Sequence, residues 1–174
     1  GSGELKSYAA ALRFINTFTD YERMVRVGYN HTTFNLSRMQ RLLAAVGKPH
    51  TKFRSVHIAG TKGKGSTATM LAYMLMGAGY RVGLYTSPHL VDMRERISIN
   101  DDMITKADFV RLLNRFVSFV RKLDAKGRPT FFELLTAIGF LYFAERKVDI
   151  AVIETGMGGR LDSTNVIKPE VCAI

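Results

Sequence analysis

A glycine-rich turn between a predicted strand and a predicted helix is the feature that most constrains this chain. Residues 53–59 are apolar enough for a buried strand, residues 60–65 contain three glycines, and residues 66–78 have the composition of a helix that ends at Gly79. Glycine allows a tight turn and a close approach of the backbone to a ligand, and the N–H groups at a helix N-terminus attract anions. The order strand, turn, helix therefore predicts an α/β fold with an anion-binding turn.

The residues of this turn fit a phosphate-binding loop better than an ordinary turn. The string Gly60-Thr61-Lys62-Gly63-Lys64-Gly65-Ser66 is similar to the G-x-x-x-x-G-K-[ST] pattern, whose lysine reaches the terminal phosphates of a nucleotide. Only two residues separate Gly60 from Gly63, however, and Gly65 stands where a hydroxyl residue should follow the lysine. A glycine-rich turn with a solvated lysine is the alternative. Because strand, glycines, lysine, hydroxyl and helix coincide, we predict that residues 60–66 bind ATP and that Lys64 is catalytic.

The rest of the chain alternates helices with strands. The predicted helices cover residues 5–18, 35–46, 105–123 and 130–146, the predicted strands cover 80–85, 148–153 and 169–174, and a hairpin covers 96–104 with its turn at Asn100-Asp101. Such alternation implies right-handed crossovers and a mostly parallel sheet with flanking helices. We predict an N-terminal helical segment, 1–52, and a phosphate-loop ATP-binding domain, 53–174. The second part is expected to be truncated at its C-terminal end, because the last strand lacks a covering helix.

The charge balance indicates an anionic ligand or partner. The chain has 25 Lys and Arg against 15 Asp and Glu, for a net charge of +10. Nucleic acid, a membrane surface or a small polyanion such as ATP would each suit this charge, and a merely soluble basic surface would as well. The sequence has no run of five like charges and no interleaving of aromatic with basic residues. We therefore expect small-molecule partners rather than nucleic acid.

The expected compartment follows from cysteine content and hydropathy. No stretch approaches the roughly 18 unbroken apolar residues of a membrane span. The single cysteine, Cys172, excludes an internal disulfide and fits a reducing compartment, so we expect a cytoplasmic protein without a membrane partner. The first residues, Gly1-Ser2-Gly3, lack a signal pattern and are interpreted as a cloning scar.

Two oxygen-bearing residues follow predicted strands and are candidate metal ligands. Glu154 ends the buried run 149–153, and a carboxylate at the C-terminal end of a parallel strand faces the crevice where ligands bind. It could hold the Mg²⁺ that accompanies ATP, or it could simply pair with a nearby basic side chain. The dense glycine of residues 155–160 favours the metal role. Ser87 follows the strand at 80–85 and would add a hydroxyl ligand on the same edge of the sheet.

Other polar residues have simpler structural interpretations. Thr130 with Glu133 three residues later is a capping box at the start of a helix. His89 is expected to form a hydrogen bond within its loop. Four further residues show neither metal-ligand spacing nor an activating partner and are expected to be structural: His31, His50, His57 and Cys172.

Three long strings, taken in order, resemble the folylpolyglutamate synthase and dihydrofolate synthase family, a branch of the Mur-type ATP-dependent amide ligases. The strings are HIAGTKGKGS at 57–66, GLYTSPHL at 83–90 and ETGMGGRLDSTN at 154–165, and the segments Arg94–Ile97 and Thr130–Glu133 agree as well. The resemblance begins near Tyr8 and covers nearly the whole chain. It implies a Mur-ligase-like ATPase fold, and it is far more specific than any single glycine loop.

The resemblance implies a ligand set. Thr61, Lys62, Gly63 and Lys64 would bind the phosphates of ATP, and Ser87 and Glu154 would bind Mg²⁺. A pocket for the pterin-bearing substrate would be formed by His31, Thr32, Thr33, Phe34, Thr130, Phe131, Phe132, Glu133, Leu161, Asp162 and Ser163. The implied reaction belongs to folate biosynthesis and one-carbon metabolism: ATP phosphorylates a folate or dihydropteroate carboxylate, and the amine of glutamate attacks the acyl phosphate.

Two departures from the family pattern qualify this expectation. Lys62 stands where the family usually has Asn, which adds positive charge and should still permit ATP binding. The family's further magnesium-binding His, its modified lysine and its glutamate-binding domain would all lie after Ile174. We therefore expect residues 1–174 to be inactive on their own. The alternatives are another Mur-type amino-acid ligase, or a nucleotide- or nucleic-acid-binding module without catalysis. We expect a monomeric parent protein, although an exposed sheet edge could let copies of the fragment pair.

Overall fold

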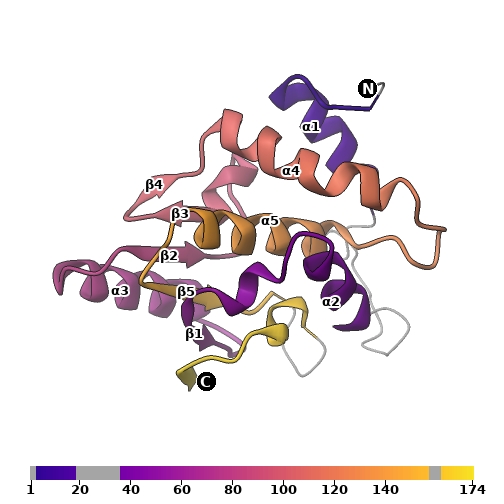
Figure 1. The fold of residues 1–174 in the computed structure, drawn as a ribbon. Helices are drawn as coiled ribbons and strands as arrows, with labels where there is room; N and C mark the ends of the chain where they lie inside the picture. Colours follow the sequence, from indigo (N-terminus) through magenta and orange to yellow (C-terminus); the bar gives the residue numbers. More distant parts are fainter. Residues whose placement is uncertain (1–2, 19–35, 157–161) are drawn as a thin grey trace.

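The computed structural model describes residues 3–18, 36–156 and 162–174, and shows one sheet with helices on both faces (Figure 1). The helices are α1 (Tyr8–Ile15), α2 (Leu36–Ala44), α3 (Lys64–Gly77), α4 (Lys106–Val120) and α5 (Phe131–Glu145). The strands are β1 (Arg54–Ile58), β2 (Val82–Tyr85), β3 (Ile97–Ile99), β4 (Asp102–Met103), β5 (Ile150–Glu154) and β6 (Val171–Ala173). Short 3₁₀ helices cover Pro49–Thr51, Met93–Arg96 and Ser163–Val166.

The sheet has the predicted mixture of parallel strands and one hairpin. Its strand order is β4-β3-β2-β5-β1-β6, in which β2, β5, β1 and β6 run parallel, while β3 runs antiparallel to both of its neighbours, β2 and β4. The hairpin turns at Asn100 and Asp101, which have φ angles of 47° and 72°, as a two-residue turn with this twist requires. The carboxyl ends of β1, β2 and β5 meet at one edge, which places the segments that follow them close together.

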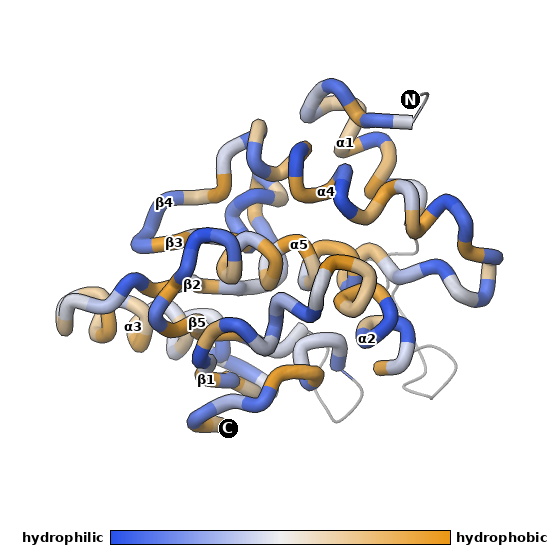
Figure 2. The backbone as a smooth tube through the Cα atoms, viewed as in Figure 1, coloured by the Kyte–Doolittle hydropathy of each residue, from blue (hydrophilic) through white to orange (hydrophobic). Residues whose placement is uncertain are grey.

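Alternating side chains along the strands separate two cores. Residues such as Ile153 and Tyr85 face the larger core, which α5, α4, α2 and α1 cover. Val152, next to Ile153 in β5, and Ile58, the last residue of β1, face the smaller core under α3. Nearly every residue of α5 from Phe131 to Phe143 is buried, because this helix lies between the sheet and the outer helices (Figure 2 shows α5 mostly in orange).

The N-terminal helices belong to the larger core. Ala11 and Ile15 of α1 and Met39 of α2 are fully buried there. Asn114 of α4 also fixes the chain before α1, since its side-chain amide accepts from the Leu5 N–H at 2.8 Å and donates to the Leu5 carbonyl at 2.9 Å. The division into 1–52 and 53–174 stays a prediction.

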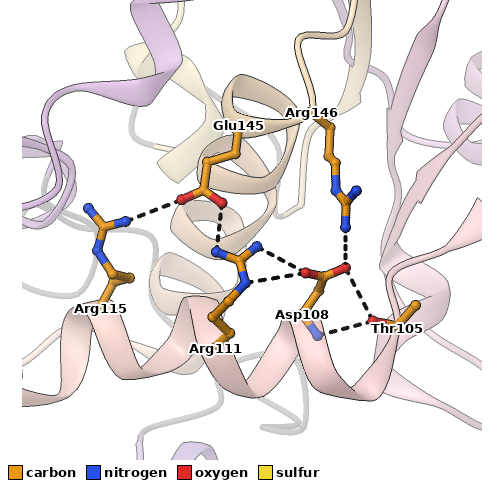
Figure 3. Close-up of polar contacts among 6 residues, drawn as sticks. All are labelled: Thr105, Asp108, Arg111, Arg115, Glu145 and Arg146. Atoms are coloured by element: carbon orange, nitrogen blue, oxygen red, sulfur yellow. Dashed lines mark hydrogen bonds and ion pairs between the residues drawn. The ribbon is translucent and has the colours of Figure 1, made fainter.

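The α4 helix is joined to the end of α5 by ion pairs at the surface (Figure 3). Asp108 accepts from Arg111 at 2.9 Å and from Arg146 at 2.6 Å. Glu145 accepts from Arg111 at 2.8 Å and from Arg115 at 3.2 Å. In the part of the chain that is described, no helix is both long and apolar enough to cross a membrane.

Candidate functional site

The predicted phosphate loop has the geometry that its glycines suggest. Gly60 has a φ angle of 140° and Gly63 one of 75°, and residues other than glycine rarely adopt either angle. The α3 helix begins at Lys64, two residues earlier than predicted, because Gly63 takes the left-handed conformation and serves as the N-cap. Lys64 and Gly65 therefore lie in the first helical turn, where backbone N–H groups have no partner within the helix.

A pocket of about 430 Å³ opens beside this loop. It is lined by Ile58, Ala59, Gly60, Thr61, Lys62, Lys64, Thr67, Ala173 and Ile174. Four of the predicted nucleotide-binding residues thus share one pocket, whereas Gly63, Gly65 and Ser66 are outside its lining. Two lysines and a helix N-terminus give the pocket a positive potential, which is suited to phosphate.

The residues of the two candidate metal ligands are in contact through the backbone N–H of Ser87, and the carboxylate of Glu154 lies at the start of α3. Glu154, the last residue of β5, is only 4% exposed, and its Oε2 accepts from the backbone N–H of Ser87 at 3.0 Å. A Cβ added to Gly65 would lie 3.6 Å from the same Oε2. The carboxylate of Glu154 therefore rests against the first turn of α3, where the helix dipole favours negative charge.

The donor set at this place fits Mg²⁺. A carboxylate and a hydroxyl are hard oxygen ligands, and Mg²⁺ in nucleotide sites takes one or two protein oxygens and completes its shell with phosphate and water. Within the described ranges, no group of three or more His, Cys, Asp and Glu side chains could hold a metal ion. A metal at Glu154 and Ser87 would consequently depend on the nucleotide for further ligands.

The loop after Ser87 behaves as its sequence predicts. The Nδ1 atom of His89 accepts from the Nε of Arg96 at 2.9 Å, so the predicted loop hydrogen bond is confirmed. Arg96 is buried, and its guanidinium lies 5.6 Å from the ring centre of Phe131. Phe131, a predicted substrate contact, is itself 1% exposed, and its ring packs against the Arg96 side chain that holds His89.

The start of α5 is a structural junction. Thr130 and Glu133 form the predicted capping box: the Thr130 Oγ1 accepts from the Glu133 N–H at 3.1 Å, and Glu133 Oε2 accepts from the Thr130 N–H at 2.9 Å. Arg38 of α2 adds two hydrogen bonds to the same carboxylate, at 2.9 and 3.2 Å. The capping interpretation is confirmed, and contact of these two residues with substrate stays a prediction.

Phe132 and Asp162, both predicted substrate contacts, flank the residue Gly156. A Cβ at position 156 would collide with the ring of Phe132, so the two segments touch only because residue 156 is glycine. Asp162 is 2% exposed, and its Oδ2 accepts from the Gly156 N–H at 3.0 Å. Its Oδ1 accepts from both the N–H and the hydroxyl of Thr164.

His57 completes this buried network and was expected to be merely structural. Its Nε2 lies 2.7 Å from the Oγ1 of Thr164, and burial lowers the pKa of the imidazole from its ordinary value of 6.5. The Asp162-x-Thr164 spacing is a cap pattern that the sequence could have revealed. The partnership with His57 could not be found in this way, because 107 positions separate it from Thr164.

Thr155 is another residue that the pattern did not single out. It follows Glu154 and is 3% exposed, and its Oγ1 has no hydrogen-bond partner in the described part of the chain. Buried hydroxyls are nearly always hydrogen-bonded, so this oxygen is available to a ligand or a water molecule.

Several predicted contacts cannot be placed. His31, Thr32, Thr33, Phe34 and Leu161 lie outside the described residues. Ser163 is described and buried at 7% exposure.

Known proteins match both the sequence and the fold. The chain is 48% identical over 142 residues to the dihydrofolate synthase/folylpolyglutamate synthase of Bacillus subtilis, a match that covers 80% of this chain and 33% of that protein. A crystal structure of folylpolyglutamate synthase from Thermotoga maritima superposes with a TM-score of 0.83 at 41% identity, covering 93% of this chain and 36% of that one. The Mycobacterium tuberculosis folylpolyglutamate synthase complexed with ADP gives a TM-score of 0.82 at 35% identity, covering 95% and 35%. No protein-family model matches.

These matches confirm the predicted α/β fold of the Mur-ligase type. The chain spans about a third of the length of the relatives, as the coverages of 33%, 36% and 35% show. Sequence and fold agree over most of the chain, which is therefore similar to the N-terminal part of the larger folylpolyglutamate synthase and dihydrofolate synthase enzymes.

Proposed function

We propose that this chain forms the ATP- and magnesium-binding part of a ligase that joins glutamate to the carboxylate of folate or dihydropteroate. The observation that carries the proposal is the position of Glu154, whose buried carboxylate lies against Gly65 and accepts from the N–H of Ser87. A carboxylate at the start of a phosphate-loop helix opposes phosphate binding unless a cation lies between them. The arrangement therefore supports a site for a nucleotide with its metal.

Each residue of the loop has a distinct role in this proposal. The N–H groups of the first turn of α3 hold phosphate oxygens, and the side chain of Lys64 neutralises the charge that builds up on the transferred phosphoryl group. Lys62 lines the same pocket and adds a second cation. Glu154 and Ser87 would hold Mg²⁺, which supplies charge neutralisation when bound.

The proposed reaction has two steps, phosphoryl transfer and amide formation. A carboxylate oxygen of the substrate attacks the γ-phosphorus, the bond to the β-phosphate oxygen breaks, and ADP leaves. The amine of glutamate then attacks the acyl carbon, phosphate leaves, and the amine loses a proton. Phosphoryl transfer requires little covalent help from a protein, so positioning and electrostatics are the main contributions of this chain.

The substrate pocket is proposed to lie on the other side of Glu154, around Phe132 and Gly156. The Phe132 ring is partly buried and offers an apolar surface for an aromatic substrate. The Oγ1 of Thr155, which has no hydrogen-bond partner within the described ranges, offers a polar contact next to Gly156. We also propose that the enzyme is a monomer that acts in the cytoplasm on small-molecule substrates. The single cysteine supports the compartment, and the basic charge supports anionic substrates.

Substitution of Lys64 tests this proposal directly. Calorimetry should show magnesium-dependent binding of a non-hydrolysable ATP analogue to the chain, and Lys64→Ala should weaken it at least about tenfold, because a charge-assisted contact to phosphate is lost. Lys122→Ala, at an exposed lysine after α4, is the matched control and should leave the affinity unchanged. Equal affinities of the Lys64 variant and the control would remove Lys64 from the site.

Turnover provides a separate test. Since the chain spans about a third of its relatives, we expect it to bind nucleotide without forming product. Phosphate release that depends on dihydropteroate or tetrahydrofolate and glutamate, by these 174 residues alone, would contradict this expectation.

A further inference from the structure

The buried network of His57, Thr164 and Asp162 has a fixed direction of hydrogen bonding. A carboxylate only accepts, so the hydroxyl proton of Thr164 is directed to Asp162. The hydroxyl oxygen then has only lone pairs left for His57. His57 must therefore carry its proton on Nε2 and donate it to Thr164.

The network connects the strand before the phosphate loop to the segment after Glu154. His57 lies in β1, one residue before the strand ends, and pairs with Ile153 of β5 in the sheet register. The pairing of these strands extends only to the Thr155 N–H, which donates to the Ile58 carbonyl at 2.9 Å. Beyond that point, the backbone at Gly156 is held by Asp162, at 3.0 Å.

We infer that His57 is a positioning residue for the metal and phosphate site: through Thr164 it orients Asp162, which holds Gly156 and so fixes the end of β5 where Glu154 lies. Its side chain faces the larger core, opposite to Ile58, so it acts without contacting the nucleotide pocket. The inference rests on the proposed function, because the site that His57 orients is the proposed ligand site.

The burial of every member makes the network sensitive to the loss of one donor. His57 is 6% exposed, Asp162 2% and Thr164 0%. Water cannot readily replace a lost partner there, and a buried polar group that loses its hydrogen bond reorients or forces its neighbours to move. The first group to be affected would be the Gly156 N–H, because its partner Asp162 would be held less firmly from the Thr164 side, where only the Thr164 N–H would keep its geometry.

Two substitutions of His57 distinguish positioning from simple packing. His57→Phe fills the space and removes the donor, whereas His57→Gln places an amide N–H near the original Nε2. His50→Gln is the matched control at a half-buried histidine in the 3₁₀ helix Pro49–Thr51. Thr164→Val removes the hydroxyl while nearly keeping the side-chain volume, and Thr164→Ser keeps the hydroxyl as its control. This second pair tests the inference if the His57→Phe variant does not fold.

The first measurement is amide hydrogen exchange in the chain without ligand, with the N–H of Val152 in β5 as the internal reference. His57→Phe and Thr164→Val should lower protection at Gly156 roughly tenfold relative to Val152, and His57→Gln and Thr164→Ser should preserve it. Unchanged protection at Gly156 in both donor-removing variants would overturn the inference. This readout needs no nucleotide, so it remains decisive even if the proposed function fails.

The second measurement is the magnesium-dependent affinity for the ATP analogue. Partners that bond a metal ligand directly typically contribute 10–100-fold in metal affinity, and His57 acts through three further residues, so we expect His57→Phe to weaken the apparent affinity for Mg²⁺ by at most about tenfold and His57→Gln to restore most of it. Equal losses in the two His57 variants would show that shape alone matters and would overturn the inference. A wild-type chain that binds no nucleotide would instead contradict the proposed function.

Discussion

Two polar clusters join distant parts of this protein, and they differ in their exposure to water. The pairs between α4 and α5 centre on Asp108 and Glu145, and their three arginines are 44–51% exposed at the side chain (Figure 3). The network between β1 and the segment after β5 centres on Asp162; its partner Thr164 is buried, and so is His57, which contacts Thr164. Both clusters contain a carboxylate with several donors, but only the second lies beside the candidate site.

Exposure decides what each cluster contributes. An exposed ion pair replaces contacts with water of similar strength, so most of its energy cancels. A buried carboxylate has lost its water, so its protein donors must all be present and correctly aimed. We therefore interpret the outer cluster as a weak contact between α4 and the end of α5. The inner cluster is interpreted as the contact that fixes the position of the backbone after β5.

The largest effect is expected from removal of the inner carboxylate. Asp162→Ala would leave the N–H groups of Gly156 and Thr164 and the Thr164 hydroxyl without their acceptor, so the free energy of unfolding should fall by roughly 3 kcal/mol. Urea denaturation measures this loss. A fall below about 1 kcal/mol, the usual range for an exposed pair, would make the two clusters equivalent and contradict the comparison.

Glu154→Gln should separate ligand binding from stability within the buried region. The amide oxygen can still accept from Ser87, so the fold should keep its stability, while the loss of charge should weaken magnesium-dependent nucleotide binding by about 10–100-fold. Calorimetry at several Mg²⁺ concentrations provides the measurement. If the nucleotide binding of the variant depends on Mg²⁺ as strongly as that of the wild type, Glu154 is not a metal ligand and has only a structural role at the end of β5.

Acidification should affect two histidines, His57 of the inner cluster and His50, in a higher pH range than the outer cluster. Burial lowers the pKa of His57, and burial together with Lys48 lowers that of His50, so the unfolded chain binds more protons and stability should decline as the pH falls below about 6.5. Partial burial alone would raise the pKa of Asp108, but hydrogen bonds from Arg111 and Arg146 outweigh it and lower the pKa. The contribution of Asp108 should therefore be lost only below its ordinary value of 3.8.

Denaturation across pH checks this two-stage profile. His57→Gln cannot be protonated in this range and should reduce the slope just below pH 6.5, whereas His50→Gln provides the comparison for the second histidine. A slope that is the same in the wild type and in both variants would show that neither histidine is responsible.

The smallest effect is expected at the outer cluster. Arg115→Ala removes one hydrogen bond of 3.2 Å from Glu145, which keeps its shorter contact with Arg111. The unfolding free energy should change by less than about 1 kcal/mol, and less still at high salt. A loss comparable to that of Asp162→Ala would mean that the exposed arginines also fix geometry.

Most of the fold followed from local patterns. The helices, the strands and the hairpin lie where periodicity and turn residues indicate, with ends that differ by a few residues. The start of α3 at Lys64 was placed two residues too late, because a left-handed Gly63 can begin a helix at once and composition does not reveal this. The capping box at Thr130 was predicted correctly, since both of its bonds are local in sequence.

The candidate site was predicted in part for the same reason. Residues 60–66 form one continuous string, and Glu154 and Ser87 could be assigned to one edge of a parallel sheet before their contact was known. The role of His57 was missed because its partner is remote in sequence and no pattern in β1 marks it. Arg38, which binds Glu133 from α2, was missed for the same reason.

The sequence by itself determined the α/β alternation, the phosphate loop and the resemblance to a ligase family, because these depend on residues that are neighbours along the chain. Only the tertiary structure decided which buried polar groups share hydrogen bonds. That choice depends on the register of β1 against β5 and on the approach of Asp162 to Gly156. The energy of such contacts comes from the exclusion of water, which is a property of the packed molecule and of no single segment.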